Sequence, residues 1–165
     1  METWSIESVS AEMTRALGER LGRLLAAGDV VTLSGDLGAG KTTMAAGIGL
    51  GLEVPEPLRS PTYLLCEEYL GREPVVHLDA YFRERLDSLL GEGLAERLAE
   101  GAVVLLEWPE RVLEWLPASR LEVRLTGMGE RRSLEFRALG AEPAARLAAL
   151  RAAWVESESG EAQNL

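Results

Sequence analysis

The sequence predicts an α/β fold in which a mixed, mostly parallel sheet is flanked by helices and carries an antiparallel extension near the C-terminus. Strand-like and helix-like patterns alternate along most of the chain, as they do in layered α/β proteins. The apolar run at residues 102–106 is typical of a central parallel strand that is covered on both faces. Two alternating segments, residues 121–125 and 133–138, flank a glycine-containing turn and indicate an antiparallel hairpin.

The N-terminal part of the chain begins with a helix pattern. A helix is expected over residues 10–27, because Ser10 is a suitable N-cap and leucines recur at helical spacing. Gly28 follows this pattern and ends it. A short strand at residues 29–34 then leads through a glycine-rich turn into a second helix at residues 41–50.

The central part of the chain alternates between the two kinds of element. Strands are expected at residues 62–70 and 74–79, and helices at residues 83–90 and 93–100. The apolar run then forms a strand at residues 102–107, which ends in an acidic side chain.

The C-terminal part consists of the hairpin and an alanine-rich helix pattern at residues 143–155. Residues 156–165 are polar and acidic, which predicts a disordered tail. The 165 residues of the chain suit a single domain, and we expect residues 1–155 to form it.

Composition excludes several classes of function. The 17 basic and 27 acidic residues give a net charge of −10, which argues against tight nonspecific binding of nucleic acid, since that needs a basic surface. The single cysteine, Cys66, excludes an intrachain disulfide and fits a reducing compartment. No apolar run approaches the roughly 18 residues that a membrane span needs, and no secretory signal is visible. We therefore expect a cytoplasmic protein without membrane attachment.

Residues 35–42 read Gly-Asp-Leu-Gly-Ala-Gly-Lys-Thr and match the pattern G-x-x-x-x-G-K-[ST] at every fixed position. The glycines allow backbone N–H groups to turn toward phosphate oxygens, and the helix that follows presents its N-terminus to the same charge. In this motif the lysine reaches the β- and γ-phosphates and the hydroxyl binds Mg²⁺. Lys41 is the only lysine in the chain, which argues against a chance glycine turn.

The motif therefore predicts a P-loop NTPase-like fold with bound nucleotide and Mg²⁺. The predicted nucleotide-binding residues in the loop are Leu37, Gly38, Ala39, Gly40, Lys41, Thr42 and Thr43. The loop itself does not distinguish ATP from GTP. ATP is favoured because the chain has no Asn-Lys-x-Asp segment of the kind that guanine-specific P-loop proteins use.

Two of the predicted strands end in carboxylates, Asp79 and Glu107. In an open parallel sheet the carboxyl ends of the strands line the ligand crevice, so both acids are candidates for the Mg²⁺–phosphate centre. A hydrolysing P-loop protein needs a second Mg²⁺-shell group and a group that orients water. The alternative is that either acid only caps a following helix. Glu107 follows five apolar residues and makes the better Walker-B strand.

Two further polar residues lie near these positions. Thr62, within Ser-Pro-Thr-Tyr at residues 60–63, has the position of a switch residue that senses the γ-phosphate, although spacing alone favours an ordinary strand entry. His77 is the only histidine and precedes Asp79 by two residues on an apolar strand. That position favours a core or supporting imidazole over a catalytic base.

The remaining candidates carry weaker signals. Trp108 directly follows Glu107, and its ring suits either a wall of the nucleotide pocket or plain packing. Cys66 lies in an apolar stretch and is expected to be inert core. Arg131 and Arg132, near the hairpin turn, are expected to be solvated rather than nucleotide-binding.

Taken in series, these segments resemble the TsaE (YjeE-type) ATPase family of bacterial tRNA threonylcarbamoyladenosine biosynthesis. The matching segments are residues 35–43, 60–63, 77–81 and 106–110, and their order and spacing also match, over about residues 8–140. The P-loop alone is generic, whereas Ser-Pro-Thr-Tyr, His-x-Asp-x-Tyr and Glu-Trp in series are far more specific. One departure is Phe82, which stands where the family usually has an arginine directly after the tyrosine.

The resemblance implies a small ATPase that works with the TsaD and TsaB proteins, which attach a threonylcarbamoyl group to the adenosine next to the anticodon. ATP hydrolysis would reset that complex, and tRNA would be met only through it. By position, Thr42 and Glu107 would hold Mg²⁺, Thr62 would be the switch residue and Asp79 would orient water.

Two alternatives belong to other classes of function. A P-loop small-molecule kinase would need an arginine-rich lid, and residues 83–97 contain few arginines and many acids. A nonhydrolytic, nucleotide-gated binding module would require Asp79 and Glu107 to be structural.

Overall fold

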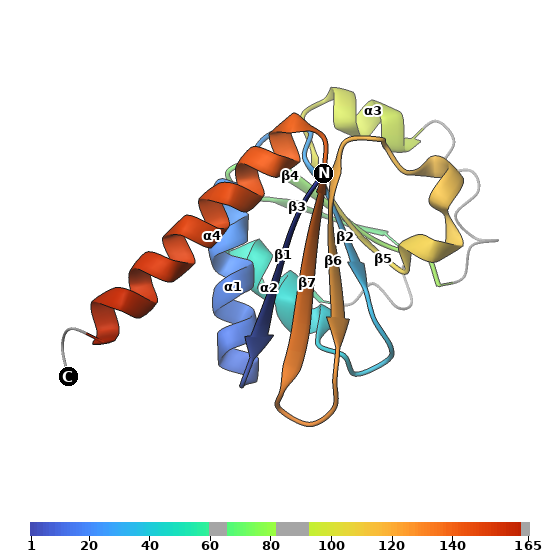
Figure 1. Cartoon of the computed structure of the whole chain (residues 1–165). Coiled ribbons are helices and arrows are strands. Elements are labelled where there is room, and N and C mark those ends of the chain that lie inside the picture. The colour runs from blue at the N-terminus through green and yellow to red at the C-terminus, as the bar shows by residue number, and fades with distance from the viewer. Residues whose placement is uncertain (60–65, 82–92, 163–165) are drawn as a thin grey trace.

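Seven strands form one sheet in the part of the chain that the computed structural model describes, residues 1–59, 66–81 and 93–162 (Figure 1). The strands are β1 (Glu2–Ser8), β2 (Val30–Ser34), β3 (Cys66–Leu70), β4 (Pro74–Asp79), β5 (Val103–Glu107), β6 (Arg120–Thr126) and β7 (Arg132–Leu139). The helices are α1 (Ala11–Leu24), α2 (Lys41–Gly51), α3 (Leu94–Ala99) and α4 (Ala141–Ala162), with short 3-10 turns η3 (Pro109–Arg111) and η4 (Leu113–Trp115).

The order across the sheet is β1-β7-β6-β2-β5-β4-β3. Strands β6, β2, β5 and β4 pair in parallel, whereas β1–β7, β7–β6 and β4–β3 are antiparallel. The predicted mixed α/β fold and its C-terminal hairpin are confirmed. Antiparallel pairings are as numerous as parallel ones, because the sheet is antiparallel toward both edges.

Strand β1 is not among the predicted elements. It pairs with β7 in antiparallel register from Glu2↔Ala138 to Ser8↔Arg132. Its apolar side chains Trp4 and Ile6 alternate with polar ones and pack against the larger core. This alternation is the pattern of a half-buried strand.

The sheet buries apolar side chains on both faces. Helices α1, α2 and α4 lie together on one side of it (Figure 1). Val103 and Leu105 of β5 belong to the larger core, which α1, α2 and α4 complete. Val104 and Leu106 belong to the smaller core on the other face, together with side chains from α3. Because side chains alternate along a strand, Glu107 projects on the same face as Leu105, the face that α2 covers.

Helices α1 and α2 meet through a seam of glycines. These are Gly18 and Gly22 on α1 and Gly47 and Gly51 on α2. A Cβ atom at Gly47 would lie 2.2 Å from the carbonyl oxygen of Arg15, and one at Gly51 would lie 2.1 Å from that of Glu19. The two backbones are therefore in direct contact, and this contact sets the position of α2 relative to α1.

The predicted start of α1 is confirmed, whereas the predicted end of the C-terminal helix α4 is wrong. Ser10 caps α1, accepting the N–H of Met13 at 3.1 Å, as predicted. The C-terminal helix, in contrast, extends through residues 156–162, where a disordered tail was expected. Polarity alone does not end a helix that packing has already nucleated, and glutamate and alanine are good helix formers.

Some predicted elements are not tested by the described part of the chain. The predicted helix at residues 83–90 lies outside it, as do the first residues of the strand predicted at 62–70. None of the described helices combines the length and apolar character that crossing a membrane requires.

Candidate nucleotide-binding site

The glycine-rich loop joins β2 to α2 at the edge where the parallel strands end. Gly40 is the N-cap of α2 and has a φ of 103°, a left-handed conformation that favours glycine. At the start of the loop, a Cβ on Gly35 would lie 2.4 Å from the carbonyl oxygen of Leu125 on β6. The loop therefore has the backbone curl that the motif predicts and packs tightly against β6.

Lys41 is buried at the first position of α2. Its Nζ donates to the carbonyl oxygens of Gly35 and Asp36, the latter at 3.0 Å, and lies 4.4 Å from the centroid of the Trp108 ring. Burial lowers the pKa of the Lys41 ammonium from its ordinary value, while nearby carboxylates, foremost that of Glu107, act in the opposite direction. Carbonyl groups of the loop itself therefore bind the ammonium of Lys41.

The two strand-end acids lie side by side. Asp79 on β4 is the register partner of Glu107 on β5, and both side chains are buried. The strand alternation places both on the face covered by α2, the helix that begins with Lys41. The two acids therefore lie next to each other at the P-loop end of the parallel strands, as expected.

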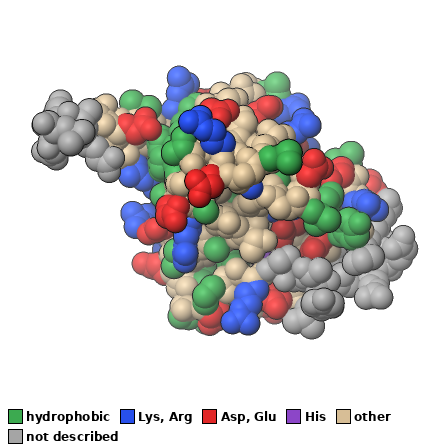
Figure 2. Space-filling model, turned by 90° about the horizontal axis from the view of Figure 1, so that it is seen from below, with side chains coloured by type: hydrophobic (Ala, Val, Ile, Leu, Met, Phe, Trp, Pro, Cys, Tyr) green, Lys and Arg blue, Asp and Glu red, His purple; other side chains and the backbone are tan. Residues whose placement is uncertain are grey.

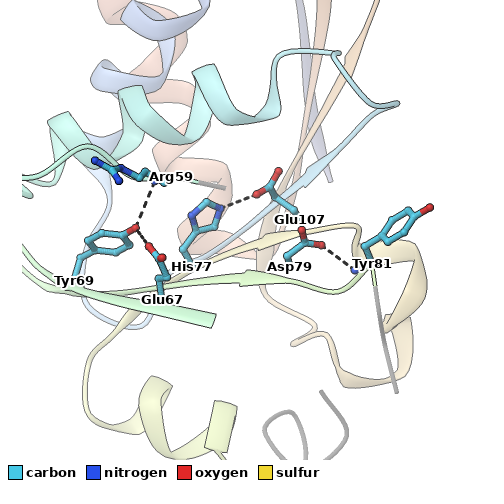
Figure 3. Close-up of polar contacts among 7 residues, drawn as sticks. All are labelled: Arg59, Glu67, Tyr69, His77, Asp79, Tyr81 and Glu107. Carbon is cyan, nitrogen blue, oxygen red and sulfur yellow. Dashed lines mark hydrogen bonds and ion pairs between the residues drawn. The ribbon is translucent and has the colours of Figure 1, made fainter. Parts of the chain in front are cut away.

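Glu107 is held by the buried imidazole of His77 (Figure 3). His77 Nε2 lies 2.9 Å from Glu107 Oε2, and since a carboxylate only accepts, the histidine nitrogen is the donor. His77 Nδ1 has no hydrogen-bond partner among the described residues. The imidazole thus supports Glu107, which is the interpretation that its position on β4 favoured.

Asp79 has a different environment. Its Oδ1 accepts the N–H of Tyr81 at 2.9 Å (Figure 3). Burial raises the pKa of the Asp79 carboxyl above its ordinary value; the N–H of Tyr81 opposes this shift, and the negative charge of Glu107 adds to it. Burial therefore makes the Asp79 carboxylate, at the C-terminal end of β4, more basic than an ordinary aspartate.

One cavity of about 460 Å³ brings these groups together. It is lined by Leu37, Gly38, Gly40, Lys41, Thr42, Thr43, Asp79, Tyr81, Glu107, Trp108 and Arg132. All the predicted site residues line it except Ala39, a loop residue that is buried, and Thr62, which lies outside the described residues. The cavity thus combines two cationic side chains, three hydroxyl groups and two carboxylates.

Trp108 forms one wall of this cavity. Its backbone has a φ of 59°, which is uncommon for a residue other than glycine, and its N–H donates to the carbonyl oxygen of Leu33 at 3.3 Å. Its ring makes an edge contact with Tyr81 at a centroid distance of 5.0 Å. The ring thus contacts both Lys41 and Tyr81. The sequence left pocket wall and plain packing open for Trp108, and these contacts fit a pocket wall.

Arg132 corrects a prediction, because it was expected to be solvated. It is half-buried, and its guanidinium donates to the carbonyl oxygens of Ala39 at 2.9 Å and Gly38 at 3.0 Å. Its neighbour Arg131 is exposed, as expected. The sequence carries no local signal for the contact, which arises because β6 runs parallel to β2 and delivers the hairpin turn to the P-loop edge.

The donor set suits Mg²⁺ with a nucleotide. No group of three or more His, Cys, Asp or Glu side chains in residues 1–59, 66–81 and 93–162 is placed to hold a metal by itself. Magnesium usually binds through one or two carboxylates together with substrate phosphates, and it prefers oxygen ligands. The Thr42 hydroxyl and the Glu107 carboxylate in the same cavity meet that description.

A family model matches residues 8–134, and its description is threonylcarbamoyl adenosine biosynthesis protein TsaE. The chain belongs to the TsaE family. A TsaE protein of Mycobacterium leprae is 46% identical over 124 residues, which cover 69% of this chain and 76% of that protein. The Bacillus subtilis TsaE protein is 37% identical over 135 residues, covering 81% and 84% of the two chains.

A solved structure agrees with this assignment. The crystal structure of Bacillus subtilis YdiB superposes with a TM-score of 0.78 at 30% identity, covering 91% of this chain and 95% of that one. The TsaE family functions in tRNA threonylcarbamoyladenosine biosynthesis. The predicted family and its link to tRNA modification are therefore confirmed.

Proposed function

We propose that this TsaE family member is a Mg²⁺-dependent ATP-binding and ATP-hydrolysing subunit, needed for threonylcarbamoylation of the tRNA adenosine next to the anticodon. Its hydrolysis would reset the TsaD–TsaB complex between cycles, in the cytoplasm, with tRNA contacted only through that complex. The observation that carries the proposal is the cavity that Lys41, Thr42, Asp79 and Glu107 line together.

In this proposal Lys41 exchanges its two carbonyl partners for the β- and γ-phosphates. The cation already lies among the loop carbonyls, so the exchange replaces neutral acceptors with anionic ones, and the opposite charge of the phosphates adds a Coulombic attraction to each hydrogen bond. Burial of the ammonium strengthens its attraction to phosphate, because screening by water is reduced.

Thr42 and Glu107 would hold Mg²⁺, which supplies charge neutralisation at the β- and γ-phosphates when it is bound. His77 holds one oxygen of Glu107 and so fixes the orientation of that carboxylate. A hydrogen bond of this kind to a ligating group is a common support of metal sites.

Asp79 would orient the attacking water. Its raised pKa makes it a better hydrogen-bond acceptor than an ordinary aspartate, and it lines the same cavity as the P-loop. Thr62 is proposed as the switch residue that responds to the γ-phosphate, on the strength of its place in the family motif.

A second hollow adjoins the cavity that contains Lys41. A hollow of about 160 Å³ shares Gly40, Thr43 and Arg132 with that cavity and continues toward the start of α1, where Ala11 and Thr14 line it. We propose that the base and ribose extend into this hollow.

Calorimetric titration with Mg-ATP tests the proposal through Lys41→Ala. No other lysine can replace this cation, so we expect affinity to fall at least tenfold, which corresponds to about 1.4 kcal/mol. Melting curves of both proteins verify that the variant is folded. Unchanged affinity in the folded variant would contradict nucleotide binding at this loop, and tight binding without any phosphate release would favour a nonhydrolytic module instead.

A further inference from the structure

Arg132 bridges the hairpin turn and the phosphate-binding loop. In addition to the carbonyl oxygens of Gly38 and Ala39, its guanidinium donates to those of Gly129 and Arg131 within the turn. The side chain also packs over the loop, since a Cβ on Gly40 would lie 3.8 Å from Arg132 Nε. One side chain of β7 therefore ties two segments that lie about ninety residues apart in the chain.

These bonds constrain the direction of the loop peptides. In a trans peptide the C=O and N–H groups point in opposite directions. With the Gly38 and Ala39 carbonyls bound to the guanidinium, the N–H groups of Ala39 and Gly40 must point away from Arg132. The Ala39 N–H does so, and it donates across the loop to the carbonyl oxygen of Asp36 at 3.0 Å.

We propose that Arg132 is a positioning residue for the P-loop, which orients the loop peptides for phosphate before the nucleotide arrives. The inference rests on the proposed nucleotide binding. The loop contains three glycines, at positions 35, 38 and 40, which have the most backbone freedom to lose on ordering. An outside clamp that is already formed in the free protein lowers that cost at the moment of binding.

Amide hydrogen exchange of residues 36–41 in the nucleotide-free protein measures the clamp directly, and Mg-ATP titration measures its consequence. For Arg132→Ala we expect severalfold faster exchange in this segment and at least tenfold weaker binding. Arg132→Lys should show both changes to a smaller degree than Arg132→Ala. Its ammonium keeps a donor near the loop, but it does not span all the acceptors that the guanidinium bridges. Arg131→Ala removes an exposed neighbouring charge and should leave both quantities unchanged.

Phosphate-release kinetics separate positioning from a general loss of structure. The Arg132→Ala protein should show a raised KM for ATP with a smaller change in kcat, since the lost interaction acts on binding. A protein that is merely destabilised would lose kcat in proportion to its unfolded fraction with KM unchanged. If Arg132→Ala does not fold, Arg132→Lys carries the same comparison.

Three results would overturn the proposal. If Arg132→Ala bound Mg-ATP more weakly but kept the wild-type rate of amide hydrogen exchange, the guanidinium would contact the nucleotide directly. Faster exchange with unchanged affinity would mean that loop order does not limit binding. If both the exchange rate and the affinity of Arg132→Ala equalled those of the wild type, Arg132 would have no role at the loop. If the wild-type protein binds no ATP, the proposed function fails, and the exchange measurement still decides whether Arg132 orders the loop.

Discussion

The neighbouring carboxylates Asp79 and Glu107, at the C-terminal ends of β4 and β5, have different environments. Glu107 shares a hydrogen bond with the buried His77, whereas Asp79 accepts only a backbone N–H among the contacts described above. Burial raises the pKa of Asp79, which is the direction that suits a group accepting a hydrogen bond from water. The difference supports the proposed division of labour, with Glu107 as the fixed Mg²⁺ ligand and Asp79 as the water-orienting group.

This division predicts two distinguishable variants. Glu107→Gln removes the ligand charge, so we expect the Mg²⁺ concentration for half-maximal phosphate release to rise about tenfold or more. Asp79→Asn should leave ATP affinity near normal and reduce turnover by roughly 10²-fold or more, the pattern of an interaction made mainly in the transition state. Glu135→Gln, which neutralises an exposed carboxylate on β7, serves as the control. Exchanged phenotypes would mean that the two roles are reversed.

The site could be predicted from the sequence only where its signals are local. Lys41 and Thr42 follow from a contiguous motif, and Asp79 and Glu107 follow from the rule that parallel strands end at one edge. Arg132 could not be predicted in this way, because its contact depends on the strand order β7-β6-β2, which no local pattern specifies.

Among the helices and strands, those with a local sequence pattern were predicted, and those that depend on distant partners were not. Helix α1 was predicted because its leucines recur at helical spacing, and strand β5 was predicted because its apolar run is continuous. Strand β1 was missed although Trp4 and Ile6 alternate, because a seven-residue edge strand gains its stability from β7, over a hundred residues away. The glycine seam between α1 and α2 likewise became visible only when the two helices were brought together.

The seam predicts a large effect from a small substitution. Gly47→Ala places a Cβ 2.2 Å from the carbonyl oxygen of Arg15, and neither backbone can move without separating the helices. We expect a loss of about 1–3 kcal/mol in the free energy of unfolding, measured by urea denaturation. Because α2 begins with Lys41, weaker Mg-ATP binding should accompany it.

A matched control is available on α4. Gly160→Ala is the same substitution at a position with no atom within 4 Å of the added Cβ, so it should be neutral or stabilising by up to about 1 kcal/mol. If Gly47→Ala were as stable as Gly160→Ala, the close contact of α1 and α2 would not hold the site in place.

For the whole molecule, charge indicates how the protein meets its pathway. The net charge is −10, and on the face shown in Figure 2 the described acidic and basic side chains are interspersed, with no continuous basic area. A surface of this kind is poorly suited to neutralising tRNA phosphates, which need clustered Lys or Arg. We therefore expect this chain to meet tRNA through a protein partner, as in the proposed function.

Under the proposed function, we expect the isolated chain to hydrolyse ATP slowly. The guanidinium of Arg132 is engaged by backbone carbonyls of the P-loop and the hairpin turn, so its hydrogen bonds are directed at the loop rather than at a γ-phosphate. Supplying a positive group in trans is worth roughly 10³–10⁵ in rate in other P-loop proteins. A partner would supply such a group or act through Thr62, the proposed switch residue.

The most direct test is a phosphate-release assay on the purified full chain with Mg-ATP, with and without the TsaD and TsaB proteins. Lys41→Ala in the presence of both partners controls for contaminating activity. We predict slow release by the chain alone, clear stimulation by the TsaD–TsaB pair, and no tight binding of free tRNA in a parallel titration. Full-speed hydrolysis by the chain alone, indifferent to added partners, would contradict this account and leave a stand-alone enzyme in its place.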